Sequence, residues 1–229
     1  MTSPVVSINA LLATLPLFMG ASREEIERIA LGTRQLNPHR GQVLFNKGDS
    51  CEGFHLVVHG QVRLVVTSPR GSEKVIDIIG PGETFGEALM FMGQPYIVYA
   101  QALANSLVLS VSKNVVFQEI ERSPQFALKM IASLCSRIHR LVREIEAQSL
   151  QSGTQRFLSY LLRDSEARGV TKGSFTVVLP ATKSTIASRL NLTPEHFSRI
   201  LRDLESRKLI ESDGRRVHIG DVDKLKKLS

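Results

Sequence analysis

The chain has 229 residues, 42% of them hydrophobic and 22% charged, so it is long and apolar enough to bury a core. It has two cysteines, Cys51 and Cys135, and no Cys-x-x-Cys pair, which excludes a zinc ribbon or a four-cysteine iron–sulfur cluster. No apolar run approaches the roughly 18 residues of a membrane span, and the first residues lack a signal-peptide pattern. We therefore expect a cytoplasmic protein without a membrane partner.

The net charge of +7 is concentrated in the last third of the chain. Residues 1–149 contain 14 Lys and Arg against 13 Asp and Glu, whereas residues 150–229 contain 15 against 9. Clustered basic side chains bind polyanions because they release the counterions condensed on phosphates. The alternative interpretation is a solvated basic face without a partner. The charge excess favours a polyanion-binding C-terminal domain.

The first half of the chain changes from a helical to a β pattern. Residues 1–35 have helical features, and Ser22-Arg-Glu-Glu25 matches a capping box. Residues 36–112 alternate short β-branched runs with glycine-containing breaks, which predicts a β-barrel or jelly roll. The predicted strands are Gln42–Phe45, Phe54–Val58, Gln61–Val66, Lys74–Ile79, Ile97–Ala102 and Leu107–Ser112.

From Ser112 the apolar pattern becomes helical, and residues 113–150 are predicted as a dimerisation helix. One stripe has the spacing of a coiled-coil seam and comprises Ile131, Leu134, Ile138, Leu141 and Ile145. A second stripe comprises Leu128, Ala132, Cys135, His139 and Val142. One interpretation is a single helix packed into one core. The other gives the first stripe to a partner chain and the second stripe to the β-domain.

A hinge is predicted at Gln151-Ser-Gly153, because glycine gives the backbone freedom and the charge balance shifts there. The pattern beyond the hinge predicts an amphipathic helix, a strand and two further helices. These elements are expected over residues 154–167, 175–179, 184–190 and 194–206.

The last two predicted helices and the segment after them form a motif. Thr193 is the expected N-cap of the second helix, with Pro194 in its first turn. Asp213-Gly214 is a two-residue hairpin signal between short apolar runs. Two helices joined by a short turn and followed by a hairpin are typical of a winged helix-turn-helix domain, which we expect over 151–229.

One face of the helix over 194–206 carries side chains that can read bases. Arg199 can donate two hydrogen bonds to guanine, Glu195 can accept one from cytosine, and Ser198 can bind several base edges. Glu195 has an alternative role, since a carboxylate in a first turn complements the helix dipole. Phosphate contacts, which fix register without reading sequence, are expected from Lys183, Ser184, Thr193, His196 and Arg202.

Motifs in both halves of the chain resemble those of the cyclic-AMP receptor protein/fumarate–nitrate reduction regulator superfamily. They are Gly41-Gln-Val-Leu-Phe-Asn-Lys-Gly-Asp49, Phe54-His-Leu-Val-Val-His-Gly60, Pro81-Gly-Glu-Thr-Phe-Gly-Glu87, Ile186-Ala-Ser-Arg-Leu190 and Glu195-His-Phe-Ser-Arg199. The resemblance implies an α+β fold. A cyclic-nucleotide-binding-type β-roll with N-terminal helices (1–112) would precede a long dimerisation helix (113–150) and a winged helix-turn-helix (151–229).

The same resemblance implies partners. A homodimer would bind double-stranded DNA and RNA polymerase. The Glu-x-x-Ser-Arg pattern at 195, 198 and 199 implies a palindrome of the type TTGAT-N4-ATCAA. An enzyme is not expected, because the sequence has no catalytic-triad spacing, phosphate-binding loop or metal-ligand cluster.

The motif that binds cyclic nucleotides in this superfamily is altered. Nucleotide-binding members have an Arg-Ser pair after the Gly-Glu turn, where this chain has Tyr96 and Ile97. No Lys or Arg occurs between Lys74 and Lys113, so a buried phosphate would lack a counter-charge. We therefore expect no cyclic nucleotide. The expected effector pocket is apolar, with Glu87, Met90, Met92, Tyr96 and Tyr99.

Residues 85–92 and 99–102 resemble the nitric-oxide-responsive branch concerned with denitrification, which is associated with haem. The resemblance implies a haem-dependent regulator that responds to nitric oxide or low oxygen. Haem needs an apolar slot and an axial ligand, for which His55, His59 and His139 are candidates. Two alternatives stay open: a regulator of the same fold with no effector or another ligand, and a sensory module that docks protein without reading DNA.

Overall fold

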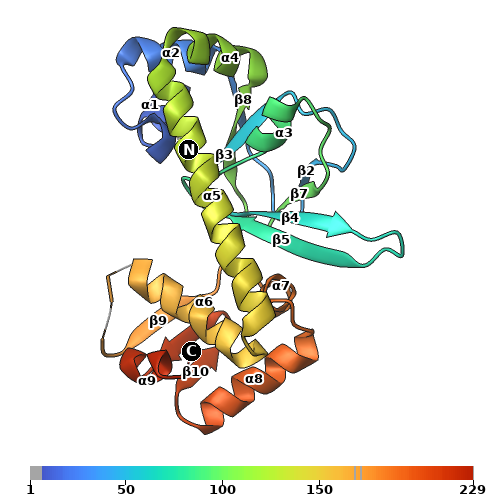
Figure 1. The fold of residues 1–229 in the computed structure, drawn as a ribbon, viewed down its shortest axis with the longest axis vertical. Coiled ribbons are helices and arrows are strands. Elements are labelled where there is room, and N and C mark those ends of the chain that lie inside the picture. The colour runs from blue at the N-terminus through green and yellow to red at the C-terminus, as the bar shows by residue number, and fades with distance from the viewer. Residues whose placement is uncertain (1–6, 168, 171, 229) are drawn as a thin grey trace, which may run out of the picture. The chain divides into compact units, whose positions relative to one another are not determined.

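The computed structural model describes residues 7–167, 169–170 and 172–228 and divides into two compact units. The first unit extends to Ile138 and the second begins at His139, so the boundary lies inside one helix. Figure 1 shows the elements of both units. The predicted domain limits at 112 and 150 stay a prediction.

The first unit begins with helices α1 (Ile8–Ala13), η1 (Pro16–Phe18) and α2 (Arg23–Leu31). The capping box is confirmed, because the Ser22 hydroxyl accepts from Glu25 N while the Glu25 carboxylate accepts from Ser22 N. The expectation of helix up to residue 35 is wrong, since α2 ends at Gly32 and a strand begins at Thr33. Residues 1–6 of that prediction lie outside the described residues.

Eight strands in the described part of the first unit form two antiparallel four-stranded sheets, which together make the β-roll. Their orders are β1-β8-β3-β6 and β2-β7-β4-β5. The strands are β1 (Thr33–Leu36), β2 (Val43–Phe45), β3 (Gly53–His59), β4 (Val62–Thr67), β5 (Glu73–Ile79), β6 (Thr84–Phe85), β7 (Tyr99–Ala102) and β8 (Leu107–Ser112). All six predicted strands are confirmed; β1, β6 and the short helix α3 (Glu87–Met92) were not predicted.

Residues 113–150, predicted as one helix, form two. α4 (Lys113–Arg122) ends before Ser123, whose backbone is extended, and α5 (Pro124–Leu150) begins at the proline. The break follows from Pro124, because proline disfavours the helical conformation in the residue before it. An ion pair fixes α4 to α2: Arg28 Nη2 lies 2.6 Å from the buried carboxylate of Glu119.

The side of α5 that packs on the β-roll is not the predicted one. Phe126 and Met130 are its buried residues, and the Phe126 ring stacks on Phe18 with centroids 6.2 Å apart. The stripe that we assigned to the β-domain is exposed, so that assignment is wrong: Leu128, Ala132, Cys135, His139 and Val142.

Arg137 completes the packed side of α5. Its Nη1 donates to Thr84 O at 3.0 Å, and its Nη2 lies 3.3 Å from Asp77 Oδ2. Glu87 Oε2 lies 3.9 Å from Nη1. Both carboxylates are almost fully buried, so Arg137 supplies positive charge where two negative charges meet in the interior.

The second unit contains the predicted helices, the predicted hairpin and the strand predicted over 175–179, which is confirmed as β9. The strands pair antiparallel in the order β10-β11-β9, and Gly214 forms the hairpin turn with φ of 55°. Helix α9 was not predicted. Beyond the end of α5, the elements are α6 (Gly153–Ala167), β9 (Phe175–Val178), α7 (Lys183–Arg189), α8 (Pro194–Ser206), β10 (Ile210–Asp213), β11 (Arg216–Ile219) and α9 (Val222–Lys226).

His55 lies in an aromatic part of the β-roll core. Its ring centroid is 5.5 Å from that of Phe45 and 5.0 Å from that of Phe85. Its Nε2 lies 3.1 Å from the Tyr96 hydroxyl, whereas its buried Nδ1 has no hydrogen-bond partner among the described residues. Burial, with a smaller contribution from the charge of Arg34, lowers the pKa of His55 from 6.5 to about 4.

This buried imidazole predicts a pH-dependent stability. Between the two pKa values of 6.5 and about 4, the unfolded chain binds a proton that the folded chain does not. The free energy of unfolding should therefore fall as the pH falls, by about 2 kcal/mol from about pH 7 to about pH 5 through His55 alone. Urea unfolding across this range should show the loss in the wild type and in Tyr96→Phe, which keeps the imidazole. His55→Gln should lack it, and an equal slope in His55→Gln would contradict the assignment.

Candidate DNA-binding surface and effector site

The helix-turn-helix is built from two capped helices. The Thr182 hydroxyl caps α7 and the Thr193 hydroxyl caps α8, each accepting a hydrogen bond from a backbone amide of the first turn. Pro194 occupies the first turn of α8, as predicted. Asn191 turns the chain between the helices with φ of 56°, a conformation that Asn tolerates better than most residues.

Arg156 of α6 holds this turn, a role that the sequence analysis missed. Its Nε donates to Leu190 O at 2.9 Å, and its Nη2 donates to Asn191 O at 3.5 Å. Gly153, which belongs to the predicted hinge, is the first residue of α6 and packs closely: a Cβ there would lie 2.8 Å from Leu192 Cδ2. The hinge itself stays a prediction.

α8 separates an apolar face from a polar one. Phe157 of α6 contacts Phe197 edge to face, with centroids 4.9 Å apart. The buried face consists of Phe197, Ile200, Leu201 and Leu204. The exposed side chains include Glu195, His196, Arg199 and Arg202. The start of α8 is therefore anchored on one side and open to solvent on the other.

Two of the predicted base-reading residues already make contacts within α8. The pKa of Glu195 lies below its ordinary value. The causes are hydrogen bonds to its own backbone amide and to the Thr193 hydroxyl, and the positive charge of Arg199. This supports the helix-dipole role that we weighed for Glu195. The Ser198 hydroxyl donates to Pro194 O at 2.8 Å, which leaves its lone pairs available as acceptors. Arg199 makes no hydrogen bond with another described residue.

The predicted phosphate contacts lie on α7, the turn and α8. Lys183 Nζ donates to Ser212 Oγ of β10 at 3.4 Å, and the Ser184 hydroxyl lies 3.0 Å from that of Thr182. Thr193 and His196 stand at the start of α8, and Arg202 is exposed about two turns further along. These residues share the second unit with the base-reading residues.

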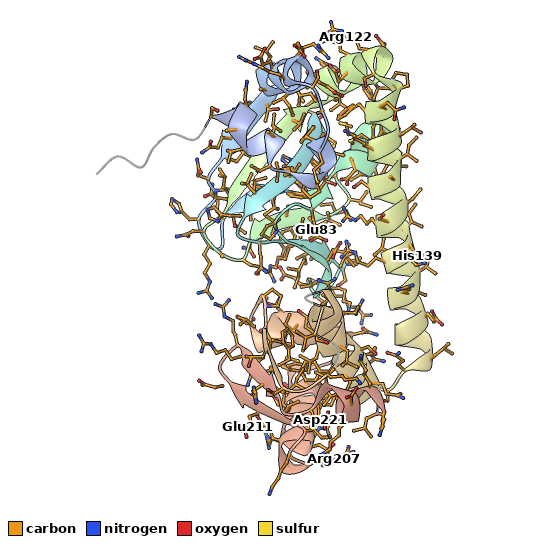
Figure 2. All side chains as sticks on the ribbon, turned by 90° about the vertical axis from the view of Figure 1, so that its left-hand side faces the viewer. Glu83, Arg122, His139, Arg207, Glu211 and Asp221 are labelled. Carbon is orange, nitrogen blue, oxygen red and sulfur yellow. The ribbon has the colours of Figure 1, made fainter. Side chains whose placement is uncertain are left out.

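The hairpin of β10 and β11, which is the wing, carries basic side chains that we did not predict as DNA contacts. Arg215 and Arg216 are exposed and lie in and just after the hairpin turn. Figure 2 shows Glu211 of β10 and Arg207, at the end of α8, on the surface of the same unit. The sequence has these two arginines directly after Asp213-Gly214. We used Asp213-Gly214 only to predict a turn and predicted no DNA contact for the arginines.

The predicted dimerisation seam on α5 is open to solvent. Ile131, Ile138 and Ile145 are 54%, 59% and 64% exposed, and Leu134 and Leu141 are partly exposed. Leu128 and Val142 of the second stripe are also exposed. Exposed apolar side chains that follow one helix mark an interaction surface.

Three of the predicted effector-pocket residues belong to α3 and do not stay together. Glu87 is buried and accepts a hydrogen bond from the Thr84 hydroxyl at 2.6 Å, in addition to its ion pair with Arg137. Met90 is 2% exposed and belongs to the apolar core. Met92 is 67% exposed in the last turn of α3 and lines no described cavity.

The two predicted tyrosines also separate. Tyr96 is buried, with its ring stacked on Phe45 at 3.6 Å between centroids. Tyr99 is partly exposed, and its hydroxyl donates to Glu73 at 2.6 Å. The partly buried hydroxyl and its acidic neighbour raise the pKa of Tyr99 to about 12. Of the five predicted residues, only Tyr96 lines the described cavity.

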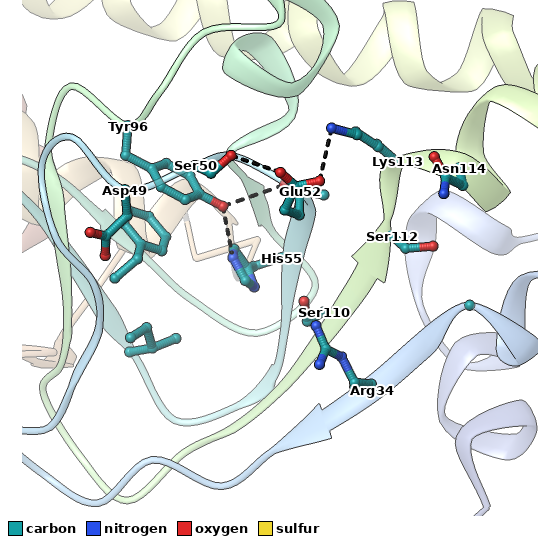
Figure 3. Close-up of a pocket in the computed structure, with 14 residues that line it drawn as sticks. Arg34, Asp49, Ser50, Glu52, His55, Tyr96, Ser110, Ser112, Lys113 and Asn114 are labelled. Atoms are coloured by element: carbon teal, nitrogen blue, oxygen red, sulfur yellow. Dashed lines mark hydrogen bonds and ion pairs between the residues drawn. The ribbon is translucent and has the colours of Figure 1, made fainter.

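That cavity, the His55 cavity, has a volume of about 420 Å³ and lies in the first unit (Figure 3). It is polar, whereas we expected an apolar pocket. Its lining includes Arg34, Phe45, His55, Tyr96, Ser110 and Lys113. A hydrogen bond between Tyr96 and His55 lies at its inner side, and ionisable groups stand around it.

The His55 cavity does not fit haem. Of the three candidate ligands, His59 and His139 are exposed. His55 has a buried Nδ1 without a partner, but charged groups line its cavity, and haem needs an apolar slot. The residues that the structure describes also contain no group of three or more His, Cys, Asp or Glu able to hold a metal ion.

Two family models match the chain. The cyclic nucleotide-binding domain matches residues 36–123, and the Crp-like helix-turn-helix domain matches residues 155–228. Among the described residues, no helix has both the length and the apolar character that crossing a membrane requires.

Known proteins resemble the chain over most of its length. It is 30% identical over 194 residues to the transcriptional activatory protein AadR from Rhodopseudomonas palustris, which covers 83% of this chain and 77% of the relative. It is 24% identical to the CRP-like cAMP-activated global transcriptional regulator of Mycobacterium tuberculosis, over 95% of this chain and 98% of that one. The structure of FixK2 from Bradyrhizobium japonicum has the same fold, with a TM-score of 0.75, 19% identity and coverage of 86% and 97%. The chain belongs to the CRP/FNR family of transcription regulators, which bind DNA and are not enzymes.

Proposed function

We propose that this regulator acts as a homodimer that reads a palindrome of the type TTGAT-N4-ATCAA. The observation that carries the proposal is the exposed first half of α8, where Glu195 and Arg199 stand one turn apart above a buried apolar face. A helix anchored in this way can enter the major groove with its first turns against the bases. The charge excess of residues 150–229 supports the same surface.

In this proposal each base-reading side chain contacts a particular base. Arg199 donates two hydrogen bonds to the guanine of the half-site. Glu195 accepts from the cytosine paired with it or from a neighbouring base; its own backbone amide, the Thr193 hydroxyl and the charge of Arg199 lower its pKa. Ser198 contacts a thymine. Because the Ser198 hydroxyl donates its proton to Pro194 O, we expect this contact to be with the thymine methyl group.

Phosphate contacts come from α7, the turn, α8 and the wing. Lys183, Ser184, Thr193, His196 and Arg202 hold the backbone and fix the register of α8. Arg215 and Arg216 add two charges at the wing, where exposed basic side chains attract the phosphates. Only the family resemblance supports a contact with RNA polymerase.

The dimer in this proposal forms along α5. The exposed isoleucines of the seam would pack against the same residues of a second chain, in the manner of a coiled coil. A two-fold dimer presents two copies of α8, which matches the two halves of a palindrome. Half-site centres should then be separated by about one helical turn of DNA.

The effector in this proposal is not a cyclic nucleotide. Glu87 is engaged by Arg137 and Thr84, and no cation lies between Lys74 and Lys113 in the sequence to meet a phosphodiester. A haem-dependent response to nitric oxide or low oxygen stays an expectation from the resemblance, and the polar His55 cavity does not support it. A regulator with another ligand is favoured by one observation, the polar His55 cavity.

Base readout predicts different outcomes for two basic residues. Arg199→Ala should cost about 1–3 kcal/mol per half-site and relax the preference at the G·C pair. Lys183→Ala should weaken all sequences alike and reduce the salt slope by about 1, since a phosphate contact carries no base information. Binding to single half-site substitutions at two salt concentrations checks both. An equal loss for every sequence in Arg199→Ala would mean that Arg199 contacts only the backbone.

The seam predicts the effect of one buried charge. Ile138→Asp places a carboxylate into each partner's apolar seam, so the dimer should lose several kcal/mol and dissociate at micromolar concentration. Ser136→Asp adds the same charge to an exposed position off the seam and should stay a dimer. Sedimentation of both variants decides. A dimeric Ile138→Asp protein would show that the seam is assigned to the wrong residues.

The occupied Glu87 site predicts no response to cyclic nucleotides. A ligand that binds only the folded state raises the melting temperature as its concentration rises. Millimolar cyclic AMP or cyclic GMP should leave the melting temperature of this protein unchanged. A rise that grows with nucleotide concentration would contradict the argument from Tyr96, Ile97 and Arg137.

A further inference from the structure

The His55 cavity is separate from the contacts of Glu87. It is lined by residues of β1, β2, β3 and β8, by the start of α4, and by the segments around residues 50 and 96. Glu87 and Arg137 do not line it. Its volume of about 420 Å³ falls in the range of small-molecule sites. What it could bind follows from the groups that point into it.

His55 presents an unused hydrogen-bonding atom to this cavity. The side chain is only 8% exposed, and Nδ1 has no partner among the described residues. The Tyr96 hydroxyl lies 3.1 Å from His55 Nε2 and 3.5 Å from Gly53 O. In the tautomer that carries the imidazole proton on Nδ1, Nε2 accepts from Tyr96 and Nδ1 is a buried donor in need of an acceptor. A carboxylate placed at Nδ1 selects this tautomer.

Arg34 adds positive charge on the same side of the sheet. It pairs with Ser110 across β1 and β8, and Ser110 pairs with His55 across β8 and β3, so the three side chains share one face. Figure 3 shows the Arg34 guanidinium directed toward Ser110 and His55. Arg34 makes no hydrogen bond or ion pair with another described residue. A guanidinium offers a fork of donors that matches a carboxylate.

The start of α4 faces the cavity as well. Ser112, Lys113 and Asn114 line it, and they are the N-cap and first residues of this ten-residue helix. The Ser112 side chain makes no capping hydrogen bond, and the first turn contains no acidic residue. The positive end of the helix dipole is therefore not balanced by a side chain of its own first turn.

The acidic residues of the cavity limit the charge of a ligand. Glu52 is paired with Lys113 at 2.8 Å and accepts from the Ser50 hydroxyl at 2.7 Å, so its charge is met. Asp49 accepts from Asn46 N at 2.8 Å, and Figure 3 shows its carboxylate on the side of the Tyr96 ring away from Arg34. A ligand with one negative charge beside Arg34 is therefore favourable. A doubly charged ligand would be repelled more strongly by Asp49 and Glu52.

We propose that the His55 cavity binds a small molecule with a single carboxylate and a flat apolar body. The carboxylate accepts from Arg34 and from His55 Nδ1, near the start of α4. The stacked rings of Phe45 and Tyr96 form the wall for the apolar body. This inference concerns only the first unit, and it does not depend on the DNA sequence that α8 reads.

The test uses benzoate as the probe and the full chain labelled with ¹⁵N-histidine. Benzoate should shift the imidazole nitrogens of His55 in a saturable way, with one molecule bound per chain. Benzamide has the same shape without the charge and should bind at least tenfold more weakly. Inorganic phosphate at about pH 8, where it is mainly doubly charged, should also bind at least tenfold more weakly than benzoate does at that pH.

Two variants separate the site from general charge effects. Arg34→Gln should weaken benzoate binding at least tenfold, and Arg40→Gln, at an exposed arginine outside the cavity, should bind as the wild type does. Because Arg34 is exposed, the melting temperature of the Arg34→Gln protein without benzoate should equal that of the wild type. An equal value shows that the fold is intact. The proposal is overturned if benzoate causes no saturable His55 shift. Equal binding of benzoate and benzamide, stronger binding of phosphate, or unchanged affinity in Arg34→Gln would overturn it too.

Discussion

The attachment of α5 to the β-roll depends on one buried charge cluster. Asp77 and Glu87 bring two carboxylates into the interior, and Arg137 brings the guanidinium that faces both. Buried ions cost several kcal/mol each unless a partner compensates them, so these three side chains fix β5, α3 and α5 to one another. Neighbouring residues on a helix point about 100° apart. With Arg137 directed inward, Ile138 is 59% exposed, and the same contact sets which side of α5 the proposed seam faces.

The cluster also decides which part of the sensory unit is chemically available. Glu87 accepts from Thr84 and is paired with Arg137, so a ligand there would compete with interactions that already exist. His55 has an imidazole nitrogen with no bond to lose. Because an unmade buried hydrogen bond is costly, a ligand gains more from supplying one than from replacing one. The sensory chemistry of this chain therefore favours the His55 side of the roll.

The sequence predicted what is encoded locally and missed what is encoded between distant segments. Six strands, the Ser22 capping box and the Thr193 cap were predictable, because each depends on residues within a few positions. The helix break at Pro124 was present in the sequence but was outweighed by a continuous apolar period. The Arg137 cluster joins residues 50 to 60 positions apart in the sequence, and no local pattern connects them; Glu87 was predicted as part of an effector pocket instead. The same limit hid the role of Arg156.

The hold of Arg156 on the turn between α7 and α8 has a mechanical consequence. The carbonyls of Leu190 and Asn191 are bonded to α6, and Gly153 lets the start of α6 sit against Leu192. α6, the turn and α8 therefore form one stiff block, and α6 directly follows the two-residue link Gln151-Ser152. Gln151 and Ser152 belong to the same block, because Gln151 O accepts from Arg156 Nη1 at 2.8 Å and Ser152 Oγ accepts from Gln155 N at 3.2 Å. A tilt of the backbone before Gln151 would therefore turn the whole block, and the proposed base-reading face would keep its shape.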